Sequence, residues 1–283
     1  MIARKPENKT CGRSIESALM LRFRYDNLYQ TRLVEKFHHG LFHVGKTYKV
    51  EDSLFLQVIN PTAGLFGGDQ FHCSIHLEPS SKVTLYSPSA TQIFTMASGE
   101  KATGYQEIQV DEEALLEWYP NSLVPHLNTS FSVGTVIRLA KNSSLFYVDL
   151  LSPGRVAYGE SLSFLSLSSQ LSIYQNENLI VREKLLIDSE TDKLRWTSFS
   201  GESAPYFATI WMAGNEKQSL NEALNNTGHQ EIDKAELQVG VTQLSESLWV
   251  KRVASRSLYK INNEIRNTQK TLKPILKLNP PRI

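Results

Sequence analysis

A glycine-rich stretch, residues 60–69 (NPTAGLFGGD), has the composition of a ligand-binding loop. It follows the apolar run 54–59, and a strand that ends in such a loop often binds phosphate. A P-loop, however, needs Lys and Ser or Thr after its last glycine, whereas Asp69 follows Gly68 and would repel phosphate. Residues 69–77 read as a strand, which disfavours a dinucleotide-binding loop. We therefore predict a tight connection between strands, with glycines at positive φ and Asp69 accepting backbone amides.

Histidines are the next residues that could bind a metal. His72 and His76 would share one face of a strand, but their Cα atoms would lie about 13 Å apart, too far to hold one ion without a bulge. Cys73 would point to the opposite face, into the core. A second cluster, FHHGLFH (residues 37–43), is interpreted as an exposed polar loop near a glycine turn. Because no CxxC or helical HxxxH pattern occurs, a tight structural zinc site is not predicted.

Covalent catalysis is not indicated by any motif. The sequence has no GxSxG, and its seven histidines show no recognisable pairing with Ser or Cys. The acidic residues 111–113 lie in the segment VDEEA, which we interpret as a turn with solvated charges. We therefore expect that the chain is not an enzyme.

The charge balance and the cysteine count limit the possible partners and compartment. The 283 residues include 30 Lys and Arg and 29 Asp and Glu, which does not favour binding to nucleic acid or to an anionic membrane. No apolar run reaches the roughly 18 residues that span a bilayer, and no apolar segment follows the basic N-terminus as in a signal peptide. Cys11 and Cys73 are too few for a disulfide framework. These features predict a cytoplasmic protein with reduced thiols.

The elements that must position these residues are mostly strands. Alternation of apolar and polar residues dominates the first 210 positions, as in residues 18–25 and 71–78. Residues 170–188 read as a hairpin with its loop at 175–178. Turn signals recur roughly every 8 to 15 residues, which favours a mainly β fold with layered, antiparallel-rich sheets.

Two helices are predicted in the C-terminal quarter. Residues 216–226 place Leu220 and Leu224 at helical spacing, and the segment 255–278 has a similar period without glycine. Ser255 or Ser257 would cap this closing helix, and Pro274 should end or kink it. Because no sequence repeat or low-complexity linker occurs, we expect a single domain over residues 1–283, with a flexible N-terminus at residues 1–14.

Six segments, in the same order along the chain, resemble motifs of one family, the urease accessory proteins called UreD or UreH. Residues 60–69 resemble its NPTGGLVGGD, residues 116–126 (LEWYPNSLVPH) its LEWLPQPLIPF, and residues 150–160 (LLSPGRVAYGE) its GRxARGE. Residues 86–94 (YSPSATQIF) are similar to a family segment that precedes an aromatic residue, and SLWVKRVASRS and NPPRI resemble its C-terminal motifs. The likeness spans roughly residues 16–283. The motif residues are Asn60, Pro61, Thr62, Gly64, Gly67, Gly68, Gly154, Arg155 and Gly159.

The sequence departs from the family pattern at four positions. Ala63 replaces a glycine, so this position should not need a positive φ. Gln92 stands where Lys is usual, His126 where Phe is usual, and Tyr158 where Arg is usual. The changes at 92 and 158 each remove a positive charge, which puts partner affinity or partner choice in doubt.

The resemblance implies a maturation factor that is not itself an enzyme. A UreD-type protein is expected to dock on apo-urease and to join a UreF-type protein, which recruits the GTPase of UreG type that brings nickel. GTP then belongs to the partner, and this chain binds no cofactor tightly. Nickel would pass in transit through water-filled passages inside the scaffold.

A nickel path of this kind needs oxygen or imidazole ligands that hold the ion weakly. Asp69, Asp149, Glu160 and Glu117 lie in apolar or glycine-rich surroundings and are our candidates for such a path. The competing interpretation is that each carboxylate caps amides or pairs with an arginine, as Glu160 could with Arg155.

Two alternative functions remain open at this point. The chain could be a β-rich scaffold for a partner other than urease, or a metallochaperone that itself binds nickel weakly. A candidate docking surface is the polar side of the closing helix, with Lys260, Arg266, Lys270 and Lys273, although basic residues on a helix are usually just solvated.

Overall fold

The protein is described from a computed structural model, in which residues 14–26, 28–119, 122–188, 190–198, 204–227 and 237–278 are placed. The expected flexible N-terminus at residues 1–14 lies, apart from Ser14, outside the described residues, as do Cys11 and the terminal NPPRI segment. Among the helices of the described part, none is both long and apolar enough to cross a lipid bilayer.

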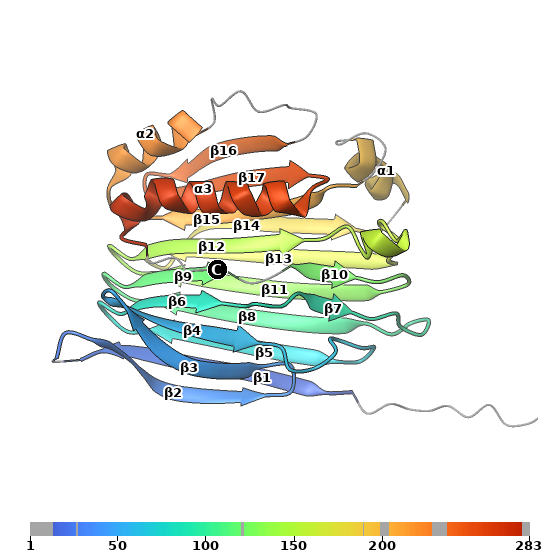
Figure 1. Ribbon diagram of the computed structural model, residues 1–283, viewed down its shortest axis with the longest axis horizontal. Coiled ribbons are helices and arrows are strands. Elements are labelled where there is room, and N and C mark those ends of the chain that lie inside the picture. The colour runs from blue at the N-terminus through green and yellow to red at the C-terminus, as the bar shows by residue number, and fades with distance from the viewer. Residues whose placement is uncertain are drawn as a thin grey trace, which may run out of the picture.

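The chain winds as a β-solenoid-like stack of two sheets (Figure 1). In the middle of the chain, from residue 53 to residue 175, the long strands alternate between the sheets, so each turn of the chain there adds one strand to both. The first sheet, sheet A, has the order β14 (Asn178–Ile187), β13 (Ser166–Gln175), β11 (Ser130–Leu139), β8 (Ala102–Val110), β5 (Gln70–Leu77), β1 (Glu16–Tyr25), β2 (Thr31–His39). The second, sheet B, has the order β16 (Gln238–Ser245), β17 (Leu248–Ser255), β15 (Tyr206–Ala213), β12 (Ser144–Leu151), β9 (Leu115–Tyr119), β6 (Lys82–Tyr86), β4 (Ser53–Ile59), β3 (His43–Val50).

The predicted mainly β, layered fold is confirmed, but its sheets are mixed rather than antiparallel-rich. The centre of sheet A, from β1 through β5, β8 and β11 to β13, is parallel, and so is sheet B from β4 to β12. Antiparallel pairs flank these centres, including the predicted hairpin of β13 and β14. The sequence pattern could not predict this, because alternation marks a half-buried strand whatever its direction. The short connections, which suggest antiparallel hairpins within one sheet, here cross to the other sheet.

The main core lies between the two sheets. Every second residue of each central strand points inward, which buries the side chains almost completely. Cys73 is among them, as predicted, and burial raises the pKa of its thiol. Full burial of an aliphatic side chain contributes about 1.5–3 kcal/mol, so this layer dominates stability. Its members include Leu19, Leu21, Phe23, Ile75, Ile108 and Ile137 from sheet A, and Val83, Leu85, Leu116 and Leu145 from sheet B.

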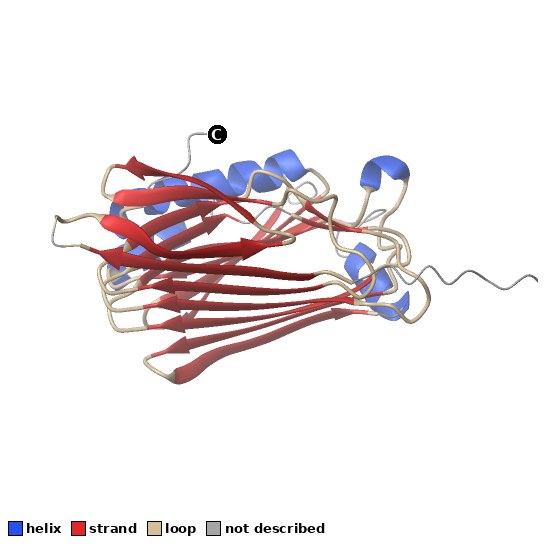
Figure 2. Ribbon diagram, turned by 90° about the horizontal axis from the view of Figure 1, so that it is seen from below, coloured by secondary structure: helices blue, strands red, loops and turns tan. Residues whose placement is uncertain are grey.

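Two helices cover the outer face of sheet B. Both predicted C-terminal helices are present, as α2 (Lys217–Thr227) and α3 (Leu258–Leu276), and Figure 2 shows the long helix along one side of the strands. The Ser257 hydroxyl caps α3 by accepting the amide of Lys260 at 3.4 Å, and the helix ends two residues after Pro274. A third helix, α1 (Glu190–Ser198), was not predicted because its amphipathic pattern is weak. The apolar side of α2 and α3 packs Leu220, Leu224, Ile261, Ile265 and Leu272 on Phe146, Ile210 and Trp249 of sheet B.

The two ends of the stack differ. At the turn end, short connections at 78–81, 111–114 and 140–143 repeat one conformation, with Ser80, Glu113 and Asn142 at φ values of 62°, 58° and 59°. Neighbouring turns are joined by hydrogen bonds, such as that from the Ser80 amide to the Glu112 carbonyl at 2.9 Å. At the loop end the connections are longer, and two further short strands, β7 (Thr91–Ile93) and β10 (Leu123–Pro125), lie there.

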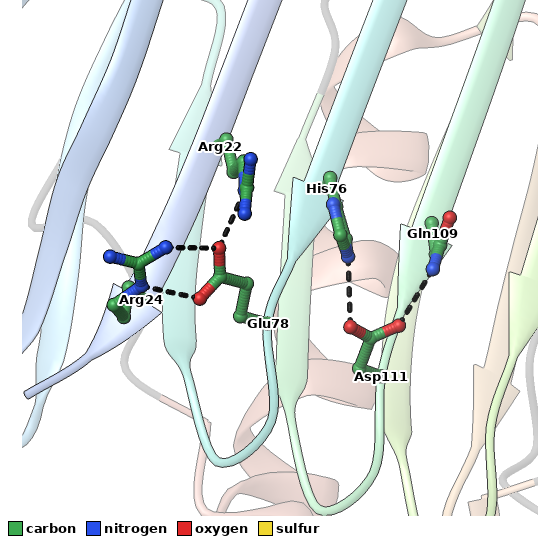
Figure 3. A network of polar contacts seen from close by, with 6 residues as sticks. All are labelled: Arg22, Arg24, His76, Glu78, Gln109 and Asp111. Atoms are coloured by element: carbon green, nitrogen blue, oxygen red, sulfur yellow. Dashed lines mark hydrogen bonds and ion pairs between the residues drawn. The ribbon is translucent and has the colours of Figure 1, made fainter.

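A polar network on the outer face of sheet A supports the turn end (Figure 3). The Glu78 carboxylate accepts hydrogen bonds from Arg24 at 2.6 Å and from Arg22 at 2.5 Å, and these arginines lower its pKa to about 2. Asp111, at the equivalent place in the next turn, lies 2.8 Å from His76 Nε2 and accepts an amide proton of Gln109 at 2.9 Å. Each carboxylate thus ties a connection to the ends of the strands beside it.

Candidate functional site

The segments singled out in the sequence come together at the loop end as a ladder of successive turns, which we call the motif ladder: residues 60–69, 91–94, 123–126 and 152–160. The Leu65 amide donates to the Gln92 carbonyl at 2.9 Å, and the Phe94 amide donates back to Leu65 at 2.8 Å. The His126 amide then reaches the carbonyl of Ile93, and the Ser152 amide that of Leu123, both at 2.9 Å. Segments scattered over a hundred positions therefore form one continuous surface.

The glycine-rich stretch is the tight connection that its composition predicts, and it joins β4 to β5. Asn60 Oδ1 accepts the amide of Thr62 at 2.9 Å and its hydroxyl at 2.7 Å. Gly64 has a φ of 150°, and a Cβ there would lie 2.2 Å from the Gln92 carbonyl oxygen. Gly68 is also at positive φ, 85°, whereas Ala63, as expected, is not.

Gly67 needs a different explanation from the one predicted. Its φ is not positive, so conformational freedom does not explain it. A Cβ at Gly67 would instead lie 2.1 Å from the carboxylate of Glu100, which caps the amide of Ala97. The position therefore leaves room for a neighbouring side chain.

Asp69 closes this loop as the predicted amide cap. Its side chain is 5% exposed, and its two oxygens accept the amides of Ile15 and Phe66, each at 2.8 Å. The carboxylate thus fixes the loop to the residue that directly precedes β1.

Glu160 and Arg155 form the predicted salt bridge at the last step of the ladder. Arg155 Nε donates to Glu160 at 2.8 Å, and this bond lowers the pKa of the carboxyl. Glu160 also accepts the amide of Leu127 at 3.1 Å. The motif glycines Gly154 and Gly159 have φ values of 142° and 75°, which the short 3-10 turn at Val156–Tyr158 requires.

The four departures from the family pattern lie in the motif ladder, and two of them are in contact. His126 Nε2 lies 2.9 Å from Gln92 Oε1, so the residues at 92 and 126 form one pair. Burial and the charge of Arg155 lower the pKa of His126, against an opposing effect of Glu160. The Tyr158 ring is 77% exposed and stacks on the Arg155 guanidinium, whose carbon lies 5.1 Å from the ring centroid. Gln92 and Tyr158 therefore contribute no charge to this surface.

Asp149 lies inside the molecule, on the inner face of β12. It lines a cavity of about 300 Å³ between the sheets, together with Glu183 of β14 and Arg252 of β17. Burial, and the charge of Glu183, raise the pKa of Asp149 to about 6. Glu183 itself is paired with Arg252. The remaining lining is largely apolar and includes Leu123, Phe131, Leu171, Trp196 and Trp211.

Glu117 lies on the opposite face of sheet B, beneath α3. It is completely buried, and it accepts hydrogen bonds from the Tyr119 hydroxyl at 2.8 Å and from Thr84 at 3.3 Å. A second buried pair joins β17 to α3, because Lys251 Nζ lies 2.5 Å from Glu264 Oε1. These polar contacts lie within the otherwise apolar layer between α3 and sheet B, and they help to hold the helix on the sheet.

The four candidate carboxylates are therefore not brought together. Asp69 and Glu160 belong to the motif ladder, Asp149 to the cavity and Glu117 to the helix interface. Sequence reasoning missed Glu183, because it lies in a strand that alternates like any other and meets Asp149 only through the stacking of the sheets.

Four of the histidines considered from the sequence contact other side chains in the described part of the chain. His72 contacts Tyr105 and His76 contacts Asp111, so the two point to separate partners, as their spacing predicts. His38 and His43 meet edge to face with ring centroids 5.1 Å apart. Within the described residues, no group of three His, Cys, Asp or Glu side chains could hold a metal ion.

Comparison with known proteins agrees with the resemblance in the motifs. The family described as "UreD urease accessory protein" matches residues 16–283. A urease accessory protein UreD from Opitutus terrae is 31% identical over 252 residues, 86% of this chain and 87% of the relative. A UreD from Halalkalibacterium halodurans is 28% identical over 81% of this chain and 87% of its own length, and a UreH from Helicobacter hepaticus is 35% identical over 48% and 53%. The chain belongs to the UreD family of urease accessory proteins.

Proposed function

We propose that this chain is a scaffold for urease maturation that docks on apo-urease and, with UreF-type and UreG-type partners, guides nickel into the urease active site. Membership of the UreD family supports a role in urease maturation. The partner scheme follows from the resemblance of the motifs, and so does the assignment of GTP to the UreG-type partner alone. The chain itself performs no covalent step, binds no cofactor tightly and works in the cytoplasm.

The observation that carries the nickel part of this proposal is the cavity between the sheets. Its volume of about 300 Å³ leaves room for about ten water molecules, enough for a hydrated cation. Asp149 and Glu183 supply carboxylate oxygens there, which are acceptable ligands for a divalent ion.

The same groups are suited to release the ion again. Glu183 is paired with Arg252, which offsets part of its charge. The raised pKa of Asp149 means that a proton competes with the metal close to neutral pH. A cargo ion must be held weakly to move on, and this combination of one shared and one readily protonated carboxylate is weak.

Of the four carboxylates considered from the sequence, Asp149 is the one that we propose for the path. Asp69 and Glu160 are engaged by backbone amides or by Arg155, and Glu117 is engaged by Tyr119 on the other face of the sheet. We propose that these three support the loops and the helix around the path.

Complementation of a urease operon that lacks its UreD-type gene tests the proposal. The wild-type chain should restore urease activity and the nickel content of purified urease. Asp149→Asn should lower both at an unchanged level of the chain, whereas Glu112→Gln, a change in an exposed turn, should not.

The outcomes separate the parts of the proposal. Failure of the wild-type chain would remove the maturation role and favour a partner other than urease. Full activity of Asp149→Asn would remove the cavity from the nickel path but leave the maturation role intact. Nickel bound by the isolated chain at micromolar concentration would favour a metallochaperone.

A further inference from the structure

The first turn of the stack leaves a groove between two free strand edges. β2 ends sheet A and β3 ends sheet B, so the outer side of both strands lacks a neighbouring strand in the described structure. The groove between them has a volume of about 930 Å³. Both strands are drawn in blue at the N-terminal side of the stack in Figure 1.

The groove is basic although the whole chain carries a net charge of only +1. Lys36, Lys46 and Lys49 line it, and all three side chains are exposed. In the strand register, Lys36 is opposite Leu21 and Lys49 is opposite Leu54. Because residues directly opposite each other lie on the same face of a sheet, both lysines lie on the inward-facing side of their strands. None of the three lysines forms an ion pair with another described residue.

Other charges on the lining are already engaged. Arg32 is paired with Asp26, and Asp52, the acidic residue of the lining, is paired with Lys82. The lysines are therefore the charges available to a ligand, and they favour a negatively charged one.

The floor of the groove is apolar. Val44 is buried there, and Leu33 and Leu54 are partly buried against the main core. An extended polypeptide can use such a floor on every second residue, while the residues between reach the rim. Acidic residues at those positions would meet Lys36, Lys46 and Lys49.

We propose that this groove binds an extended, acidic segment of a partner protein, which pairs as an added strand with the free edge of β2 or β3. Main-chain hydrogen bonds to a sheet edge provide affinity in this mode, and the pockets provide specificity. A second copy of this chain is disfavoured as the occupant, because it would bring the same lysines to the interface. The inference does not depend on the proposed function.

Nucleic acid fits the groove less well than an acidic peptide. Phosphates would meet the three lysines, but they would leave the apolar floor and the free backbone groups unused. Recognition of nucleic acid also relies on an extended basic surface, which the near-neutral chain does not have.

A labelled peptide tests the groove in the full-length chain. The probe is a fluorescein-labelled decapeptide in which glutamates alternate with valine and threonine, and its binding is followed by anisotropy. The wild-type chain should bind it, and a decapeptide with lysine in place of glutamate should bind at least about tenfold more weakly. Binding should weaken with added salt, and amide exchange in β2 or β3 should slow in the complex.

A pair of matched variants separates the groove from general charge. K46E/K49E should weaken binding at least about tenfold, whereas K101E/K141E, with the same change of net charge at exposed lysines elsewhere, should change it less than about twofold. Equal losses in both variants, equal binding of the lysine peptide, or unchanged amide exchange in both strands would overturn the proposal. So would tighter binding of a single-stranded oligonucleotide of ten nucleotides that displaces the peptide.

Discussion

Single carboxylates in this protein have different roles because their surroundings differ, although the sequence presents them alike. Asp69 has both oxygens occupied by amides, whereas Asp149 lines a cavity in which burial and Glu183 raise its pKa to about 6. The second arrangement favours the neutral form of the carboxyl group, whereas the first needs two acceptor oxygens to pair both amides. Mutation of each should therefore have effects of opposite sign.

Asp149→Asn should stabilise the protein at neutral pH. The folded-state pKa of Asp149 lies above its ordinary value of 3.8, so the folded protein binds the proton more tightly and loses stability as the pH rises from about 4 to about 6. Removal of the charge should recover up to about 3 kcal/mol at pH 7.5 and close to nothing at pH 4. Urea denaturation of both proteins at the two pH values measures this, and an equal effect at both would contradict it.

Asp69→Asn should destabilise the protein. The amide group can accept only one of the two hydrogen bonds, and its NH₂ group would face a backbone N–H. We expect a loss of about 1–3 kcal/mol in the free energy of unfolding at pH 7. The same urea titration measures the loss, and Asp188→Asn at an exposed position is the control.

At the scale of elements, the attachment of α3 depends on a buried ion pair as well as on apolar packing. Lys251 is completely buried in β17, and its partner Glu264 is in α3. The attraction within such a buried pair roughly offsets the free-energy cost of removing both charges from water. Replacement of both partners should therefore cost little, whereas loss of one partner leaves the other charge buried and unpaired.

Lys251→Met should destabilise the protein by about 3–5 kcal/mol, because it leaves Glu264 buried without its partner. The double variant Lys251→Met with Glu264→Leu should recover most of this loss. Chemical denaturation of both single variants and the double variant gives the coupling energy. Additive effects would show that the two side chains do not depend on each other.

The repeated turns at the turn end contain a removable strain. Glu113 has a φ of 58°, where a side chain is disfavoured, and Asn142 has the same conformation with a residue type that tolerates it better. Glu113→Gly should raise the melting temperature through a gain of about 0.5–1 kcal/mol, while Asn142→Gly should change stability little. Differential scanning calorimetry compares them, and a loss of stability in Glu113→Gly would refute the interpretation.

Local features of the fold could be predicted from the sequence, whereas its winding could not. The positions of Leu220 and Leu224 predicted α2, and the Asn, Asp and glycine residues of 60–69 predicted a tight turn, because neighbouring residues determine both. The five-residue spacing of Arg155 and Glu160 likewise predicted their contact. Parallel pairing joins residues about thirty positions apart, and no sequence repeat marks that period.

The same limit applies to the contacts between segments. Gln92 and His126 form a pair only because β7 and β10 are neighbours in the ladder. Glu183 reaches Asp149 from the other sheet, and no spacing rule connects them. The contacts of a residue could thus be predicted where its partner is close in the sequence, but not where the partner comes from another turn of the stack.

The winding also predicts how the molecule opens. Because each turn contacts chiefly the turns beside it, interior strands are held on both sides and terminal ones on one side. Native-state hydrogen exchange should therefore be slowest in β5, β8 and β11 and fastest in β2 and β3. Uniform exchange across sheet A would mean that the stack opens as a single unit.

The connections at the turn end have a consequence for changes in chain length. Each of them sets which side chains of the following strand face the core, so deletion of one residue from 111–114 would turn Trp118 outward and bring Glu117 between the sheets. We expect insertions to be tolerated instead at the opposite end, for example beside Gly99, where a Cβ would meet no atom within 4 Å. Homologues should vary in length there, and a short epitope tag placed at that position should leave the winding intact.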